Sequence, residues 1–206
     1  MPTIIRQRRR PLFLAVVLTL AFGLTANRLN SQSGTNEKAT TVYLVRHAER
    51  ADSGMSAGTD PSLSAEGRAR AEKLAGLLSG CSISAVYTTP FKRTTETAQA
   101  VVEKSKIEGS PIAVNPREMA SLLDQIHKAR GKSALVVGHS NTIPAIARAL
   151  AGRDDAVPDI PETSYDNLFV VTITRWEPRE AEVKLFRYGA PSTPLSTLPD
   201  FTGCSK

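Results

Sequence analysis

The chain has 206 residues, enough for one globular domain of ordinary size with short extensions, and its formal net charge is +6. The positive excess lies at the start, because residues 1–36 hold five of the 26 basic residues and no acidic one, which leaves 21 basic against 20 acidic residues. The body of the chain is therefore nearly neutral. We expect no general basic face for a nucleic acid.

Residues 1–26 are organised like an export signal. Arginines at positions 8–10 precede an uncharged apolar run at 11–24, which is shorter than the roughly 20 residues that span a bilayer. A basic start followed by a short apolar run favours a secretory signal peptide. No clean A-x-A site follows, so an uncleaved membrane anchor stays open, as does a buried N-terminal helix. We expect an exported protein, periplasmic or anchored facing the periplasm, which fractionation of the full-length chain would test.

Residues 27–40 are polar and predict a flexible linker before a domain that spans 41–190, with a tail at 191–206. The chain has two cysteines, Cys81 and Cys204. In an oxidising compartment an even number of cysteines can pair, and two free thiols are the alternative.

Strand-like and helix-like segments alternate along the domain. Apolar and β-branched runs predict strands, while spacings of three and four between apolar residues predict helices. In chain order we expect a strand at 41–46, a loop at 50–62, a helix at 65–79 capped by Ser64, a strand at 83–88, a helix at 91–104, a weak strand at 112–114, a helix at 117–129, a strand at 134–138, a helix at 142–151, and a hairpin of strands 168–174 and 181–187. This order predicts an α/β fold, with a mainly parallel sheet flanked by helices on both faces.

Two of the three histidines and two arginines follow predicted strands. Arg46 and His47 end the first strand, Arg93 opens the helix after the second, and His139 follows the strand at 134–138. The carboxyl ends of parallel strands share one edge of a sheet, where ligands bind. Guanidinium forks and helix N-termini bind phosphate oxygens. The four side chains therefore predict a site for a phosphoryl dianion.

At these residues the sequence resembles the histidine phosphatase superfamily, which is phosphoglycerate mutase-like. The resemblance rests on three blocks in order: R-H-A-E at 46–49, T-T-P-F-K-R-T at 88–94 and V-V-G-H-S-N-T at 136–142. It covers roughly residues 41–190, and it departs from the family at Ala48, where many members have glycine.

The resemblance implies an enzyme of the histidine acid phosphatase type, with His47 as the nucleophile that forms a phosphohistidine. Arg46, Arg93 and His139 would hold the transferring phosphoryl group. Asn141 matches an asparagine that follows the second histidine in mutase-type members, and it is a candidate phosphate ligand or an ordinary helix-start residue.

Glu49 is a second candidate for binding or for orienting a catalytic group. A leaving alkoxide also needs a proton, which in the resembled family comes from a carboxylic acid between the second arginine and the second histidine. We choose Glu118, because it follows the weak strand at 112–114 and opens the next helix; the alternative is a glutamate placed there by the helix dipole. The other candidates in this stretch are Glu96, Glu103, Glu108 and Asp124.

Other functions fit the sequence less well. A mutase would need a cover over its phosphohistidine, and only 45 residues separate Arg93 from His139. A module that binds phosphoryl groups without catalysis would not need all four residues. The G-H-S-N-T segment resembles a serine-hydrolase elbow, but no histidine follows His139. A metal hydrolase could use His47, Glu49 and His139, yet arginine neighbours suit an anion.

We therefore expect a phosphatase that needs no metal and no cofactor. Its partner is a small phosphorylated substrate, which the sequence does not identify; sugar phosphates of the cell envelope follow from the expected location alone.

Overall fold

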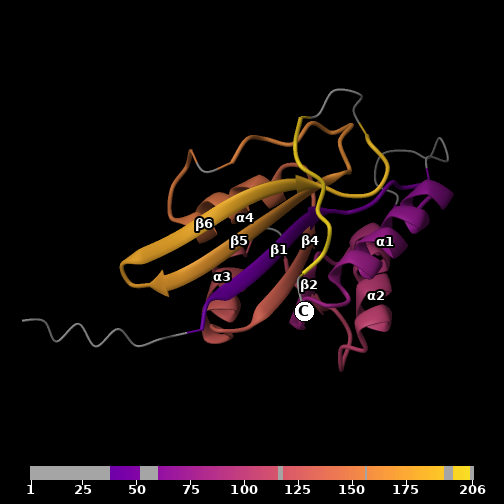
Figure 1. Cartoon of the computed structure of the whole chain (residues 1–206). Helices are drawn as coiled ribbons and strands as arrows, with labels where there is room; N and C mark the ends of the chain where they lie inside the picture. The colour runs from indigo at the N-terminus through magenta and orange to yellow at the C-terminus, as the bar shows by residue number, and fades with distance from the viewer. Residues whose placement is uncertain (1–37, 52–59, 116–117, 156, 193–196, 205–206) are drawn as a thin grey trace, which may run out of the picture. The chain divides into compact units, whose positions relative to one another are not determined.

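The computed structural model describes residues 38–51, 60–115, 118–155, 157–192 and 197–204 (Figure 1). The predicted leader at 1–26 and most of the predicted linker lie outside these ranges. Within them, no helix is long and apolar enough to cross a membrane.

Six strands form one sheet in the order β3-β2-β4-β1-β5-β6 (Figure 1). The first four strands run parallel to one another, whereas β5 is antiparallel to β1 and pairs with β6 as a hairpin. The sheet therefore confirms the mainly parallel α/β fold. The strands are β1 (Thr40–Arg46), β2 (Ile83–Thr88), β3 (Ile112–Ala113), β4 (Ser133–Gly138), β5 (Asn167–Trp176) and β6 (Arg179–Arg187).

Two helices cover each face of the sheet. Helices α1 (Ala65–Leu78) and α2 (Lys92–Ser105) lie on one face, and α3 (Met119–Lys128) and α4 (Thr142–Ala151) lie on the other. Alternate residues of β1 belong to different cores, because successive side chains of a strand point to opposite faces. Val42 and Leu44 pack in the core with α3 and α4, and Tyr43 and Val45 in the core with α1 and α2. β1 is thus buried on both sides.

The pairing of β1 with β4 aligns the ends of the two strands. Arg46 lies opposite Gly138, and the backbone N–H of His47 donates to the carbonyl of Gly138 at 2.9 Å. A Cβ at Gly138 would lie 2.8 Å from Thr142 Oγ1, so a larger residue would displace the start of α4. The segments that carry His47 and His139 therefore leave the sheet side by side.

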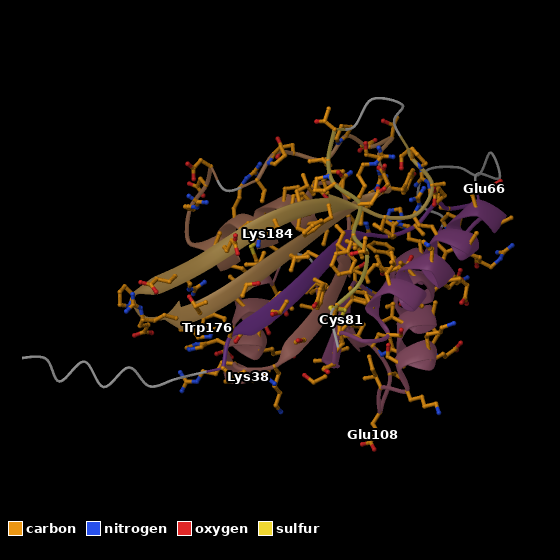
Figure 2. All side chains as sticks on the ribbon, viewed as in Figure 1. Lys38, Glu66, Cys81, Glu108, Trp176 and Lys184 are labelled. Carbon is orange, nitrogen blue, oxygen red and sulfur yellow. A yellow bond between two sulfur atoms is a disulfide. The ribbon has the colours of Figure 1, made fainter. Side chains whose placement is uncertain are left out.

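The C-terminal tail is fixed to the domain at two places. Cys204 forms a disulfide with Cys81, with a Cα–Cα distance of 5.2 Å, so the two cysteines do pair. Cys81 lies just before the start of β2 (Figure 2). The backbone N–H of Phe201 donates to the carbonyl of Arg187 at 2.7 Å, which continues the edge of β6. The disulfide closes a loop of more than half the chain, which restricts the unfolded state.

The start of α1 packs against the segment that follows His47. Ser64 caps the helix as predicted, since its Oγ accepts the N–H of Gly67 at 3.1 Å, and its own N–H donates to the carbonyl of Glu49 at 2.9 Å. A Cβ at Gly67 would lie 2.0 Å from that carbonyl oxygen. Only glycine allows the helix to approach the backbone so closely.

We predict that Gly67→Ala destabilises the domain by about 3 kcal/mol or more, at the upper end of the cost of overpacking, because a rigid backbone carbonyl must move. Gly76→Ala is the matched control on the same helix, where a Cβ meets nothing within 4 Å. It should raise stability by roughly 0.5–1 kcal/mol through helix propensity. Urea denaturation of both variants measures the difference, and equal effects would contradict the packing argument.

Candidate active site

His47 lies buried at the carboxyl end of β1, with 4% of its surface exposed. Its Nδ1 lies 2.8 Å from the carbonyl oxygen of Ala48. A carbonyl only accepts hydrogen bonds, so Nδ1 carries the proton and Nε2 keeps a free lone pair. Burial, followed by the charges of nearby groups that include Arg46, lowers the pKa of His47 to about 3. At neutral pH the ring is therefore neutral and nucleophilic at Nε2.

Arg46 is held from one side by the loop before β5. Its Nη1 donates to the carbonyls of Pro161, Glu162 and Ser164, at 3.4 Å for Pro161 and 3.2 Å for Ser164. The guanidinium carbon lies 4.1 Å from the centroid of the Tyr165 ring, and Nη2 lies 3.4 Å from the tyrosine hydroxyl. Nη1 is fully engaged by the protein, which fixes the plane of the guanidinium group.

Arg93 sits in the first turn of α2 and is fixed in the same way. Its Nη1 lies 3.4 Å from Asp60 Oδ1, and the backbone N–H of Lys92 donates to the same carboxylate at 2.9 Å. Asp60 thus caps α2 and orients Arg93 at once. The guanidinium carbon of Arg93 lies over the ring of Phe91, 4.4 Å from its centroid.

Both arginines keep a buried Nε–H group without a hydrogen-bond partner among the residues that the structure describes. Arg46 and Arg93 both lie close enough to His47 for their charges to lower its pKa. An unpaired buried donor costs free energy, and an anion that accepts from these groups would remove that cost. Two guanidinium groups held in fixed positions also suit the oxygens of a phosphoryl group.

His139 follows β4 and lies beside His47, with ring centroids 5.4 Å apart. A chain of hydroxyls sets which of its nitrogens carries a proton. Thr94 Oγ1 lies 2.8 Å from the carbonyl of Thr89 and 2.7 Å from that of Phe91, so its hydrogen goes to a carbonyl. Thr89 Oγ1, 2.9 Å away, must then donate to Thr94.

It follows that Thr89 Oγ1 accepts from His139 Nε2, which lies 3.0 Å away. Nε2 is therefore the protonated nitrogen of His139. Burial, followed by the charges of Arg93 and Arg46, lowers the pKa of His139 to about 4. Both histidines are thus neutral at pH 7 when no anion is bound.

Three residues that the sequence proposed for the site make no contact that the structure gives with Arg46, His47, Arg93 or His139. The carboxylate of Glu49 binds Arg70 through both oxygens, at 2.7–2.9 Å, and so anchors the segment after His47 to α1. Asn141 is exposed at the start of α4 and makes no side-chain cap. Glu118 is exposed at the start of α3, with Oε1 3.3 Å from Asn115 Nδ2. Their roles at the site stay predictions.

The remaining acid candidates have other partners or positions. Glu96 accepts the N–H of Leu63 at 2.8 Å, Glu103 accepts from Gln99 at 2.9 Å, and Asp124 pairs with Lys128. Glu108 lies beyond the C-terminal end of α2, far from Glu66 in the first turn of α1 (Figure 2). In the part of the chain described, no group of three or more histidine, cysteine or acidic side chains is placed to hold a metal ion.

The sequence predicted that Arg46, His47, Arg93 and His139 lie together, but it did not predict the residues that hold these side chains in place. Asp60, Thr89 and Tyr165 contact Arg93, His139 and Arg46 respectively. Thr89 lies inside the T-T-P-F-K-R-T block at 88–94 and could have been identified from it. Asp60 and Tyr165 stand in loops, where the sequence carries no helix or strand periodicity that would predict their contacts.

Part of the chain matches a known protein family. The sequence matches the description "Histidine phosphatase superfamily (branch 1)" over residues 42–117, which include Arg46, His47 and Arg93. The sequence has no significant match among curated proteins.

Solved structures share the fold at low sequence identity. The protein histidine phosphatase SixA, complexed with tungstate, is 18% identical with a TM-score of 0.55, over 73% of this chain and 97% of that one. A mycobacterial glucosyl-3-phosphoglycerate phosphatase, complexed with VO3, is 15% identical with a TM-score of 0.53, over 73% and 99%. A phosphoglycerate mutase from Bacillus anthracis strain Sterne is 16% identical with a TM-score of 0.52, over 68% and 90%.

The direction of the hydroxyl chain gives a prediction for Thr89. In the native protein, ¹⁵N NMR should show His139 as the Nε2–H tautomer. Thr89→Val removes the acceptor, and the Nδ1–H form should rise from a minor to a comparable population. Thr89→Ser keeps the hydroxyl and should keep the tautomer. A native His139 that is mainly Nδ1–H would show that Thr89 donates instead.

Proposed function

We propose that this chain, whose residues 42–117 match the histidine phosphatase superfamily, hydrolyses phosphomonoesters through a phosphohistidine on His47. One observation carries the proposal: a neutral imidazole with a free Nε2 lies beside two fixed arginines whose buried Nε–H groups have no partner among the described residues. This arrangement supplies a nucleophile and a preorganised site for the charge of the phosphoryl group.

The reaction proceeds in two displacements. The lone pair of His47 Nε2 attacks phosphorus, the P–O bond to the leaving group breaks, and the departing oxygen takes a proton from an acid. Water then attacks phosphorus, the P–N bond breaks, and its electron pair returns to Nε2. The proton of the water passes to the carboxylate left by the first step, and inorganic phosphate departs. Arg46, Arg93 and His139 offset the charge on the equatorial oxygens throughout.

Hydrolysis fits the chain better than phosphoryl transfer to a second substrate. Between Arg93 and His139 lie the rest of α2, strand β3, helix α3 and strand β4, and the two helices pack against opposite faces of the sheet. In the described part of this stretch no further element remains to cover a phosphohistidine. This supports hydrolysis, in which water reaches the intermediate.

Glu118 is our proposed proton donor, supported by its place after β3. That strand runs parallel to β2, so its carboxyl end lies at the edge of the sheet where β2 delivers Arg93. Asp60 is the rival, because it contacts Arg93 directly. The two carboxylates differ in what they would do: Asp60 holds a binding group in place, whereas a proton donor acts on the leaving oxygen.

The proposal predicts a covalent intermediate on His47. Rapid acid-free quenching with a good substrate should trap a base-stable, acid-labile phosphate on this residue. His47→Ala should abolish the label and lower kcat/KM by at least about 10³-fold, since it removes the nucleophile. His127→Ala is the control: this histidine lies on α3 and stacks on Trp176, so its removal should leave labelling intact. Full turnover by His47→Ala would overturn the proposal.

The proton donor can be identified by leaving-group chemistry. Glu118→Gln should slow the hydrolysis of alkyl phosphates by roughly 10²–10⁴-fold, and that of p-nitrophenyl phosphate far less, because nitrophenolate leaves without a proton. Asp124→Asn, on the same helix, is the control. If Asp60→Asn gives the selective loss and Glu118→Gln does not, the role belongs to Asp60. Equal losses on both substrates would indicate a positioning role.

A further inference from the structure

Each arginine–histidine pair of the site has an aromatic ring packed against it. Building on the proposed function, we propose that these rings, Phe91 and Tyr165, form a subsite for a planar, apolar leaving group of the phosphomonoester. The subsite selects the organic part of the substrate, while Arg46 and Arg93 bind its phosphoryl group.

Phe91 is an exposed aromatic residue at the start of α2. It and Ile112 are the exposed large hydrophobic residues among those described, with 37% and 44% of their surfaces accessible. The ring is not an isolated surface residue, because it lies between two members of the site. The guanidinium carbon of Arg93 is 4.4 Å from its centroid, and the His139 ring meets it edge-on at 5.5 Å.

The backbone holds this ring in place at a helix start that favours other residues. The carbonyl of Phe91 accepts the N–H groups of Thr94 and Thr95 at 3.0 and 3.1 Å, so the residue is fixed to the first turn of α2. Its side chain caps nothing, whereas Ser, Thr, Asp and Asn are preferred at that position. An exposed aromatic ring at a cap is unfavourable locally, and such departures concentrate at functional sites.

Tyr165 is the counterpart beside the other pair. Its ring centroid lies 6.0 Å from that of His47, and the Arg46 guanidinium lies over it at 4.1 Å. Its backbone N–H donates to Ser192 Oγ at 2.9 Å, which fixes the loop before β5. Tyr165 also borders a cleft of about 610 Å³.

The chemistry of the rings decides which part of the substrate they contact. The faces of aromatic rings carry negative electrostatic potential, so they are poor partners for phosphate oxygens. They pack well against apolar and planar groups, and an aromatic pair gains about two- to tenfold in affinity beyond the area that it buries. A ring attached near the phosphorus atom is thus favoured over a polar or saturated group.

The test compares benzyl phosphate with cyclohexylmethyl phosphate. Both release a primary alcohol, so they differ in planarity and not in the need for a proton. The native protein should prefer benzyl phosphate by about two- to tenfold in kcat/KM. Phe91→Leu should bring this ratio close to one, and Phe91→Tyr should keep it. Ile112→Ala is the matched control, an exposed apolar residue on β3 that should leave the ratio unchanged.

The ratio of kcat/KM for the two phosphates shows whether Phe91 belongs to a subsite or only supports the structure. Loss of the packing between Phe91 and Arg93 would lower kcat/KM for both substrates alike. Loss of a subsite would change the ratio of the two kcat/KM values. Binding of benzylphosphonate and cyclohexylmethylphosphonate, measured by calorimetry, repeats the comparison without catalysis. Failure of the proposed function would appear as binding without hydrolysis. A native ratio of one in both assays, or a ratio that Phe91→Leu retains, would overturn the subsite.

Discussion

The pairing of Arg46 with Gly138 is the constraint on which the site depends. A backbone hydrogen bond from His47 to Gly138 fixes this register at the last residues of β1 and β4. A shift of one residue would send the side chains of β1 to opposite faces and separate the two histidines. Both strands lie between covered faces, so the apolar cores that surround them also hold the register.

The site holds positive charge in a buried place, and this charge shapes both histidines. Burial is the larger cause of their lowered pKa values, and the arginines add to it. From pH 6.5 down to about 4 for His139, and down to about 3 for His47, the unfolded chain therefore binds more protons at these histidines than the native site does. Their contribution to stability is complete above that range and falls as the pH drops through it. The same burial and charges leave Nε2 of His47 without a proton at neutral pH, so that its lone pair can attack phosphorus.

The sequence predicted the sheet, the helices and the four central residues because each has a local signal. Apolar runs define the strands, Ser64 stands at a helix start as a cap, and strand order places His47 near His139. The supports of these residues have no such signal. Asp60 reaches Arg93 from a loop 33 residues away in sequence, and Tyr165 reaches Arg46 across 119. Such contacts depend on how loops pack on a finished sheet.

Binding of a phosphoryl group would change the electrostatic balance at the two histidines. A dianion between Arg46 and Arg93 offsets the charges that lower the pKa of His139, so the protonated ring becomes more favourable. Thr89 already accepts the Nε2–H of that ring, and protonation would add a second N–H donor at Nδ1 without disturbing the first. His47 differs, because its Nε2 must stay free until it bonds to phosphorus. Two neighbouring histidines are thus suited to different tasks by the groups that hold their other nitrogens: a carbonyl for His47 and a hydroxyl for His139.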